Sequence, residues 1–323
     1  MKKKILISYK IPSVGFDVLG DNFEVIFPKD DQISDAELNE HIETCDAIVS
    51  VFGHQLSNEH ITRASKLKLI ANFGVGYDNI DIPFVSNRGI TVTNTPDPVT
   101  EPTAELAMGL MVAVARKIGA LNNQLRTADG VKVGVMKNLS TTLTGKTLGI
   151  VGMGAIGQAL ARRALAFGMH IIYHNRQPLP ADIEGKYCTH RVPLETLLKD
   201  SDVVSLHTPL TTETKHLINF AEFNLMKNTA YIINTARGSV INQKALIAAL
   251  QNKQIAGAGL DVFENEPHIP RELLTFNNVV ATPHVGTATL ETRKEMSILV
   301  SQIIRKFFTG ELQNYIVNKN NLH

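Results

Sequence analysis

The stretch LGIVGMGAIG, residues 148–157, decides the fold of this chain. Residues 148–151 form an apolar run that predicts a buried strand, and the pattern of residues 156–167 predicts a helix directly afterwards. Between them, Gly152, Gly154 and Gly157 give the spacing GxGxxG. The first glycine permits a tight turn, the second lets a pyrophosphate approach the backbone, and the third lets the helix pack closely on the strand. Because a helix N-terminus presents free N–H groups to phosphate, the sequence predicts a dinucleotide site that includes Ala155 and Ile156.

The residues after the next predicted strand, 170–173, indicate which dinucleotide binds. An acidic residue there would hydrogen-bond the ribose 2′-OH of NAD and repel the 2′-phosphate of NADP. This chain instead has Asn175 and Arg176, and the next acid is Asp182. A guanidinium can make a bidentate, charge-assisted contact with a phosphate. We therefore expect NADP(H) to be preferred, with NAD(H) as the alternative; in the competing interpretation, Arg176 is a surface arginine that points into solvent.

Short apolar runs alternate with helical patterns along the chain. Strands are predicted at residues 4–8, 23–27, 47–51, 69–73, 90–93, 148–151, 170–173, 203–206, 230–234, 256–260 and 279–281. Helices are predicted at residues 35–43, 58–64, 101–121, 156–167, 194–199, 243–251 and 290–308. This alternation predicts an α/β fold with two doubly wound parallel sheets. Since Pro96 and Pro98 disfavour both helix and central strand, we expect the chain to cross between domains at residues 94–98.

The composition is typical of a soluble globular protein with two domains, because 44% of the 323 residues are hydrophobic. A net charge of +1 gives no electrostatic reason to expect nucleic acid or a membrane surface as a partner. The most apolar run, residues 106–115, is too short to span a bilayer, and the run after Lys4 is too short for a signal peptide. Cys45 and Cys188 provide neither a disulfide framework nor a metal motif, so we expect no metal and a cytoplasmic location.

Three charged residues follow predicted strands in the second half of the chain. Arg237 follows strand 230–234, Glu266 follows strand 256–260, and His284 follows strand 279–281. Because ligands of open parallel sheets bind beyond the carboxyl ends of the strands, we expect the three side chains to converge. An arginine can bind a carboxylate through two hydrogen bonds, a histidine can protonate a carbonyl oxygen, and a neighbouring carboxylate stabilises the imidazolium. The three residues predict hydride transfer to a small 2-oxo acid with His284 as proton donor, although each alone is also typical of a surface charge.

The order of motifs along the chain resembles that of the D-isomer-specific 2-hydroxyacid dehydrogenase family. The motifs are GVGYDNID at 74–81, the glycine-rich stretch, NTARG at 234–238, DVFENEP at 261–267 and PHVG at 283–286. Within the family, residues 94–97, 103–106 and 175–178 look most like the glyoxylate/hydroxypyruvate reductases. The resemblance covers essentially the whole chain and implies a D-2-hydroxy acid as product.

The resemblance also implies further site residues. The backbone N–H groups of Val75 and Gly76 would bind the substrate carboxylate together with Arg237. Cofactor contacts would come from Thr103, His207, Thr208, Pro209, Thr214, Thr235, Ala236, Asp261, His284 and Gly286, in addition to the glycine-rich stretch, Asn175 and Arg176. Residues 207–209 would border the adenosine, and Asp261 would accept a hydrogen bond from the nicotinamide carboxamide.

The domain arrangement implied by the resemblance is a Rossmann nucleotide-binding domain, residues 99–288, inserted in a flavodoxin-like substrate domain, residues 1–98 and 289–323. Members of the family are usually homodimers joined through the Rossmann domain, including the segment after the long helix. Glyoxylate/hydroxypyruvate reductases often bring a partner tryptophan into the pocket from the region matching 130–143. This chain has no Trp and offers Val131, Val133, Val135 and Met136 there, so a longer 2-oxo acid stays open as the substrate.

Other members of the superfamily give alternative interpretations. Formate dehydrogenases carry Gln where Glu266 stands, which disfavours them. A short form of phosphoglycerate dehydrogenase stays open. The NAD(H)-responsive corepressor scaffolds of the C-terminal-binding-protein type keep the Arg, Glu and His, but they usually have a long C-terminal tail and an acidic residue for NAD. Both features are absent here, so the scaffold is the more remote alternative.

Overall fold

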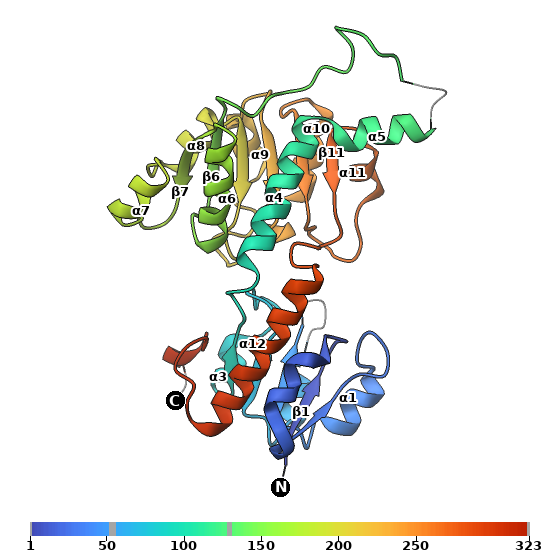
Figure 1. Cartoon of the computed structure of the whole chain (residues 1–323), viewed down its shortest axis with the longest axis vertical. Helices are drawn as coiled ribbons and strands as arrows, with labels where there is room; N and C mark the ends of the chain where they lie inside the picture. The colour runs from blue at the N-terminus through green and yellow to red at the C-terminus, as the bar shows by residue number, and fades with distance from the viewer. Residues whose placement is uncertain (1, 52–55, 128–130, 322–323) are drawn as a thin grey trace. The chain divides into compact units, whose positions relative to one another are not determined.

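The computed structural model describes residues 2–51, 56–127 and 131–321. The chain divides into two compact units. Figure 1 colours the chain by residue number, from blue at the N-terminus to red at the C-terminus. The first unit consists of residues 1–99 and 287–323, and the second consists of residues 100–286. The chain therefore leaves the first unit once and returns to it for its last long helix.

The first unit contains a five-stranded parallel sheet in the order β2-β1-β3-β4-β5. Its strands are β1 (Lys3–Ile7), β2 (Phe23–Ile26), β3 (Ala47–Ser50), β4 (Leu69–Asn72) and β5 (Thr91–Thr93). Its helices are η1 (Ser13–Asn22), α1 (Asp35–His41), α2 (Asn58–Arg63), α3 (Ile82–Ser86), α12 (Leu290–Thr309) and the short η3 (Lys319–Asn321). Strands β3 and β4 are buried throughout, as the apolar runs predict for central strands.

Alternate side chains of these strands enter two separate cores. Leu6, Ile48 and Ile70 pack with apolar residues of α1, α2 and α3. Ile7, Val49 and Ala71 pack on the other face with residues of η1 and α12. Helix α12 begins at the Thr289 cap, whose side chain accepts from the backbone of Thr292, and ends at Gly310 in the left-handed region. The two-sided burial is that of a doubly wound sheet.

The second unit contains a six-stranded parallel sheet in the order β11-β10-β9-β8-β6-β7. Its strands are β6 (Thr147–Val151), β7 (His170–His174), β8 (Val203–Leu206), β9 (Tyr231–Asn234), β10 (Gly257–Leu260) and β11 (Val279–Ala281). Its helices are α4 (Thr100–Ala115), α5 (Ile118–Thr127), α6 (Ala155–Ala166), α7 (Ala181–Lys186), α8 (Leu194–Asp200), α9 (Phe220–Leu225), η2 (Gly238–Val240), α10 (Gln243–Gln251) and α11 (Arg271–Thr275).

This sheet is also covered on both faces. Leu148 and Ile150 pack with α4 and α6 on one face, while Val151, Val204 and Ile232 pack with α8, α9 and α10 on the other. Every residue of β8, β9 and β10 is buried. The predicted α/β fold with two parallel, doubly wound sheets is therefore confirmed.

One predicted helix is wrong in its extent. The pattern at residues 101–121 predicts a single helix, but the structure has α4 and α5 with a break at Lys117, whose φ is +56°. Eight residues of α4 are buried, and none of residues 118–126 of α5 is. The environment changes at the break, because α4 packs against the sheet whereas α5 lies on the surface. The junction between them carries the basic residues Arg116 and Lys117, which are favourable at the end of a helix.

Candidate active site

The predicted site residues of the second unit lie at the carboxyl ends of its strands. Across the sheet, Asn175 follows β7, Gly152 follows β6, Thr208 follows β8, and Thr235 follows β9. Asp261 follows β10 and His284 follows β11, at the far side of the same edge. An elongated ligand along this edge would meet the glycine-rich turn first and the charged residues last, as a dinucleotide does in folds of this type.

The glycine-rich turn can adopt its shape only with glycine at two positions. Gly152 has φ +97°, and a Cβ on it would lie 2.8 Å from the carbonyl carbon of His207. A Cβ on Gly157 would lie 2.5 Å from the oxygen of Gly152, so the start of α6 packs tightly on the turn. By contrast, a Cβ on Gly154 would have no atom within 4 Å. Gly154 is the N-cap of α6, and no side chain caps the free N–H groups there. The backbone is therefore open at Gly154, with Ala155 and Ile156 in the first turn, and this cradle fits a pyrophosphate.

Asn175 and Arg176 lie directly beyond β7 and beside this turn. The side-chain oxygen of Asn175 accepts from the backbone N–H of Met153 at 2.7 Å, which ties Asn175 to the glycine-rich turn. A second arginine, which the sequence analysis missed, supports the loop. Arg191 donates from Nε to the Asn175 carbonyl (2.7 Å) and from Nη2 to the Arg176 carbonyl (3.1 Å). Arg191 lies beside residues 175 and 176 because its backbone pairs with that of Tyr173 in β7. No local motif in the sequence indicates this pairing.

Two threonine hydroxyls along the same edge are buried without a partner in the described part of the chain, those of Thr208 and Thr235. A buried hydroxyl without a partner costs free energy unless a ligand or water satisfies it. Both residues are on the predicted list of cofactor contacts, and the donor set fits the phosphates and hydroxyls of a nicotinamide dinucleotide. Thr214 closes the neighbouring loop by donating to the Pro209 carbonyl at 2.6 Å.

His207 also lies at this edge, with its ring turned inward. Its Nε2 lies 2.8 Å from the Ser205 hydroxyl. Burial lowers the pKa of His207 to about 4, because a buried ring lacks the water that would solvate its protonated, charged form. His207 is therefore neutral at physiological pH and contributes no charge to the neighbouring phosphate-binding turn.

His284 and Glu266 form a close pair. His284 Nδ1 lies 2.7 Å from Glu266 Oε2, and the other carboxylate oxygen accepts from the Phe263 backbone N–H at 2.8 Å. Burial acts to raise the pKa of Glu266, but the hydrogen bond and charge of His284, the Phe263 N–H and the charge of Arg237 together lower it. Glu266 is thus ionised beside the imidazole, with Arg237 near enough to act on it.

Arg237 reaches this pair through a tight turn after β9. The Asn234 side chain donates to the Arg237 carbonyl at 2.9 Å and accepts from the Ala236 N–H at 3.0 Å. The next residue, Gly238, has no room for a Cβ, which would lie 1.9 Å from the carbonyl carbon of Phe263. The turn of Arg237 therefore packs directly on the loop that carries Glu266.

Asp261 organises the turn that carries His284. It is 1% exposed, and its carboxylate accepts from the Thr282 hydroxyl (2.6 Å) and the backbone N–H groups of Val285 and Gly286 (both 2.8 Å). His284 itself has φ +54°, a conformation that is strained for a residue with a side chain. These hydrogen bonds stabilise that conformation. Burial raises the pKa of Asp261 in spite of these hydrogen bonds.

Contact of Asp261 with the carboxamide of a nicotinamide stays a prediction. Thr103 of α4 lies beside this turn, since a Cβ on Gly286 would be 3.5 Å from its hydroxyl.

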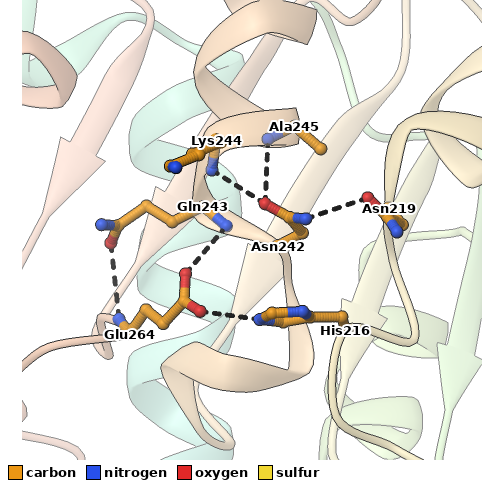
Figure 2. Close-up of polar contacts among 7 residues, drawn as sticks. All are labelled: His216, Asn219, Asn242, Gln243, Lys244, Ala245 and Glu264. Carbon is orange, nitrogen blue, oxygen red and sulfur yellow. Dashed lines mark hydrogen bonds and ion pairs between the residues drawn. The ribbon is translucent and has the colours of Figure 1, made fainter.

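A second His–Glu pair braces the same loop, as Figure 2 shows. Glu264 Oε1 lies 2.7 Å from His216 Nε2, and its Oε2 accepts from the Gln243 N–H at 3.2 Å. Gln243 is the first residue of α10, whose N-cap, Asn242, donates to Asn219 at 3.1 Å. Glu264 therefore joins the loop of Glu266 to the segment after Thr214 and to α10. The sequence analysis missed this pair, although Glu264 stands in the motif at 261–267.

The two predicted substrate contacts of the first unit, Val75 and Gly76, lie in the loop after β4, at the carboxyl edge of the five-stranded sheet. Within the described ranges, no group of three or more His, Cys, Asp or Glu side chains is arranged to hold a metal ion. Among the helices that the structure describes, none combines the length and the apolar character that crossing a membrane needs.

Comparison with known proteins gives the family. Residues 108–286 match the model of the D-isomer specific 2-hydroxyacid dehydrogenase, NAD binding domain. A glyoxylate reductase of Thermococcus litoralis is 45% identical over 324 residues, which is 99% of this chain and 98% of that protein. The structure of an NADPH-dependent glyoxylate/hydroxypyruvate reductase from Sinorhizobium meliloti, in complex with NADP and malonate, is 33% identical with a TM-score of 0.88, covering 100% of this chain and 99% of the other.

A second similar structure contains NAD in place of NADP. The D-lactate dehydrogenase of Aquifex aeolicus, complexed with NAD and lactic acid, is 27% identical with a TM-score of 0.87, covering 98% of this chain and 99% of the other. The family match and the full-length relatives agree with two features described above. These are the glycine-rich turn and the charged residues at the carboxyl edge of the six-stranded sheet. This chain therefore belongs to the D-isomer specific 2-hydroxyacid dehydrogenase family and is an NAD(P)-dependent oxidoreductase.

Proposed function

We propose that the protein is an NADPH-preferring reductase that converts a small 2-oxo acid of the glyoxylate/hydroxypyruvate type to the D-2-hydroxy acid, with His284 as proton donor. The observation that carries the proposal is the 2.7 Å contact between His284 Nδ1 and Glu266, near the charge of Arg237 and at the carboxyl edge of the six-stranded sheet. A glyoxylate reductase that is 45% identical to this chain supports the substrate class.

The bound nicotinamide cofactor supplies the hydride that is added to the carbonyl carbon of the 2-oxo acid. The Arg237 guanidinium binds the substrate and draws electron density toward the carbonyl oxygen. As negative charge grows on that oxygen, the His284 imidazolium donates its Nε2 proton to it, because Nδ1 is occupied by Glu266. The ionised Glu266 stabilises the imidazolium before the transfer and fixes the orientation of the ring. The product is the neutral hydroxyl, and His284 takes up a proton from solvent for the next cycle.

The NADPH preference is supported by charges at the end of β7. Asn175 supplies an amide where a carboxylate would repel the 2′-phosphate, and Arg176 follows it in an exposed position. Arg191 adds a second guanidinium while it holds the carbonyls of Asn175 and Arg176. The hydrogen bond from the Thr211 hydroxyl lowers the pKa of the exposed Glu213, and the charge of Arg176 lowers it further, so Arg176 lies near the loop that follows residues 207–209.

We also propose a homodimer. Residues 131–140 follow α5 without helix or strand, and they expose apolar side chains to a degree that is unusual for a monomer. Val133 is 98% exposed, Val135 94% and Met136 75%. A partner subunit that covers these residues would remove their apolar surface from water. In related reductases, residues 130–143 correspond to the region that carries the partner tryptophan. The first of these residues, Gly130, lies outside the described residues.

A cytoplasmic location is proposed as well. Cys45 and Cys188 are free thiols, one buried and one exposed, which is usual in a reducing compartment.

The test is steady-state loss of absorbance at 340 nm with NADPH or NADH and a panel of 2-oxo acids: glyoxylate, hydroxypyruvate, pyruvate, phenylpyruvate and branched 2-oxo acids. The proposal expects the highest kcat/KM for glyoxylate or hydroxypyruvate with NADPH. Preference for a bulky 2-oxo acid would keep the mechanism and change the substrate, with the Trp-free segment as the reason. Oxidation of phosphoglycerate in the reverse assay would favour that alternative. Tight cofactor binding with no turnover on any substrate would instead favour a scaffold.

A further inference from the structure

In the loop after β4, the three consecutive carbonyl groups of residues 74–76 are all hydrogen-bonded to nearby donors. The Asn72 side chain donates from Nδ2 to the carbonyl of Gly74 (3.0 Å) and to that of Gly76 (2.9 Å). The Asn94 side chain donates to the carbonyl of Val75, which lies between them, at 2.9 Å. The backbone N–H of Thr95 donates a further hydrogen bond to the Gly74 carbonyl at 3.0 Å. Two asparagines therefore fix the peptide planes of residues 74–76.

The planarity of the peptide bond converts these contacts into an orientation for the N–H groups. In a trans peptide, the C=O of one residue and the N–H of the next point in opposite directions. The Gly74 carbonyl points to Asn72, so the N–H of Val75 points away from it. Likewise, the Val75 carbonyl points to Asn94, so the N–H of Gly76 points away from that side chain. In the described part of the chain, neither N–H donates to an acceptor, and the Val75 side chain is 39% exposed.

The orientation of the Asn72 amide is settled by its surroundings. The residue is the last of β4 and is 2% exposed. With its amide reversed, Oδ1 would face two carbonyl oxygens, which repel it, whereas Nδ2 can donate to both. In the observed orientation, Oδ1 is buried and accepts from no group in the described residues. The Asn72 side chain thus leaves its acceptor atom without a hydrogen bond, while its Nδ2 group donates to the carbonyls of Gly74 and Gly76.

We propose that Asn72 and Asn94 are positioning residues for substrate binding: by engaging the carbonyls of residues 74–76, they hold the N–H groups of Val75 and Gly76 ready for the substrate carboxylate. This inference rests on the proposed function and on the family resemblance, which implies that the N–H groups of Val75 and Gly76 bind the substrate carboxylate. Two N–H groups fixed before binding stabilise an anion without the cost of ordering the loop when the substrate arrives. Neither asparagine touches the reacting carbonyl, so both act through the loop.

The test is Asn72→Asp, which keeps the shape of the side chain but replaces the NH₂ donor by an acceptor. The carboxylate would repel the Gly74 and Gly76 carbonyls and turn their peptide planes. Because the substrate carboxylate is bound alike in the ground and transition states, KM for the 2-oxo acid should rise at least tenfold while kcat changes less than threefold. The inhibition constant of oxamate, measured with the cofactor present, should rise by a similar factor. Asn94→Ala frees one carbonyl only and should give a smaller rise in KM.

The matched control is Asn318→Asp. Asn318 is 1% exposed in the same unit and donates to a backbone carbonyl, that of Ile90, at 2.9 Å, and its other hydrogen-bond partners are Ser86 and Val92 and not residues 74–76. It should lower the melting temperature without raising KM or the oxamate constant. If Asn72→Asp and Asn318→Asp lower the melting temperature equally and leave both constants at the wild-type value, the inference is overturned while the proposed function stands. A wild-type enzyme that binds NADPH but neither oxamate nor any 2-oxo acid would overturn both.

Discussion

At the scale of single residues, the contact between His284 and Glu266 gives the most direct test of the chemistry. Glu266→Gln can keep the hydrogen bond from the Phe263 N–H, so the loop should keep its shape. The amide NH₂ would then face His284 Nδ1, which must be unprotonated to accept it. Because the imidazolium loses its carboxylate partner, kcat should fall about 100-fold.

Cofactor affinity serves as the internal control for Glu266→Gln, measured by quenching of NADPH fluorescence. It should change little, since Glu266 acts on the proton and not on the dinucleotide. A variant with unchanged kcat would remove Glu266 from the proposed role. His284→Asn should lose at least as much activity, because it removes the donor itself.

His207 predicts a pH dependence of stability that is separate from catalysis. Its pKa is about 4 in the folded chain and 6.5 for a free histidine, so the unfolded chain binds more protons between those values. Stability therefore decreases as the pH falls through this window. The free energy of unfolding should drop by about 2 kcal/mol between pH 7 and pH 5 from this residue alone.

Urea denaturation at the two pH values, with wild type and His207→Gln, measures this contribution. Gln can still reach Ser205 but cannot be protonated, and acids such as Glu266 contribute equally to both proteins. The pH-dependent difference between the two proteins isolates His207. Identical pH dependence in both would show that His207 titrates normally in the folded chain.

At the scale of elements, the end of β7 should control which cofactor is used. Asn175→Asp is isosteric and can still accept from the Met153 N–H, so the glycine-rich turn should keep its conformation. The new carboxylate should repel the 2′-phosphate and bind a free 2′-OH. The NADPH:NADH ratio of kcat/KM should fall at least tenfold, a change of about 1.4 kcal/mol in relative binding.

Asn175→Ser is the control for this change, because it removes the amide without adding a charge. A ratio that moves equally in both variants would attribute the effect to the turn and not to the phosphate. Arg191→Met should also lower the ratio, since it removes a cation and frees the carbonyls of Asn175 and Arg176.

The elements also show how far local sequence can be interpreted. The central strands were predictable because they are continuous apolar runs, and β8 was predicted with the bounds that the structure gives. Helix α4 was predicted but not its end at Ala115, since apolar residues resume at Ile118 after the two basic residues, and the packing distinguishes the buried α4 from the exposed α5. The 3-10 segment η1 was not predicted. It depends on a contact far along the chain, where a Cβ on Gly15 would lie 2.3 Å from the Ser297 backbone.

The same distinction holds for the candidate site. The residues that stand in motifs, such as Gly152 and His284, could be named from the sequence. The residues that hold them in place could not, because their partners are distant: Arg191 acts on residue 175, and His216 acts on residue 264. Asn72 left a signal that could have been used, namely a polar residue at the end of an otherwise apolar strand that runs into GVGYDNID.

At the scale of the whole molecule, the six-stranded sheet explains why motifs that are separate in the sequence lie along one edge. The glycine-rich turn and the charged residues are about 80 to 130 positions apart in the sequence, counted from Gly152 to Arg237 and to His284. Parallel strands bring them to one edge, and the strand order β11-β10-β9-β8-β6-β7 spreads them along it in the order that a dinucleotide requires. The residues that we propose for cofactor specificity and for proton transfer therefore lie at opposite ends of one sheet, and we expect them to be separable by mutation.

Assembly is the last property that can be tested at this scale. Apolar side chains are concentrated on α5 and the segment that follows it: Ile118, Leu125, Val133, Val135, Met136 and Leu139 are all more than half exposed. Isolated exposed apolar residues are common, but such a concentration in one surface segment is typical of an interface. Val133→Asp combined with Val135→Asp should place two charges in the proposed dimer contact, where their desolvation opposes association.

Light scattering after gel filtration at micromolar concentration should give a dimer for wild type and a monomer for the double variant. The fold of each subunit should be unaffected, since both valines are almost fully exposed at 98% and 94%. Leu290→Asp is the matched control, because Leu290 is 78% exposed but lies at the start of α12, and it should stay dimeric. A monomeric wild type would refute the dimer. A double variant that stays dimeric would move the interface to another surface, and the exposed valines would then need a different partner.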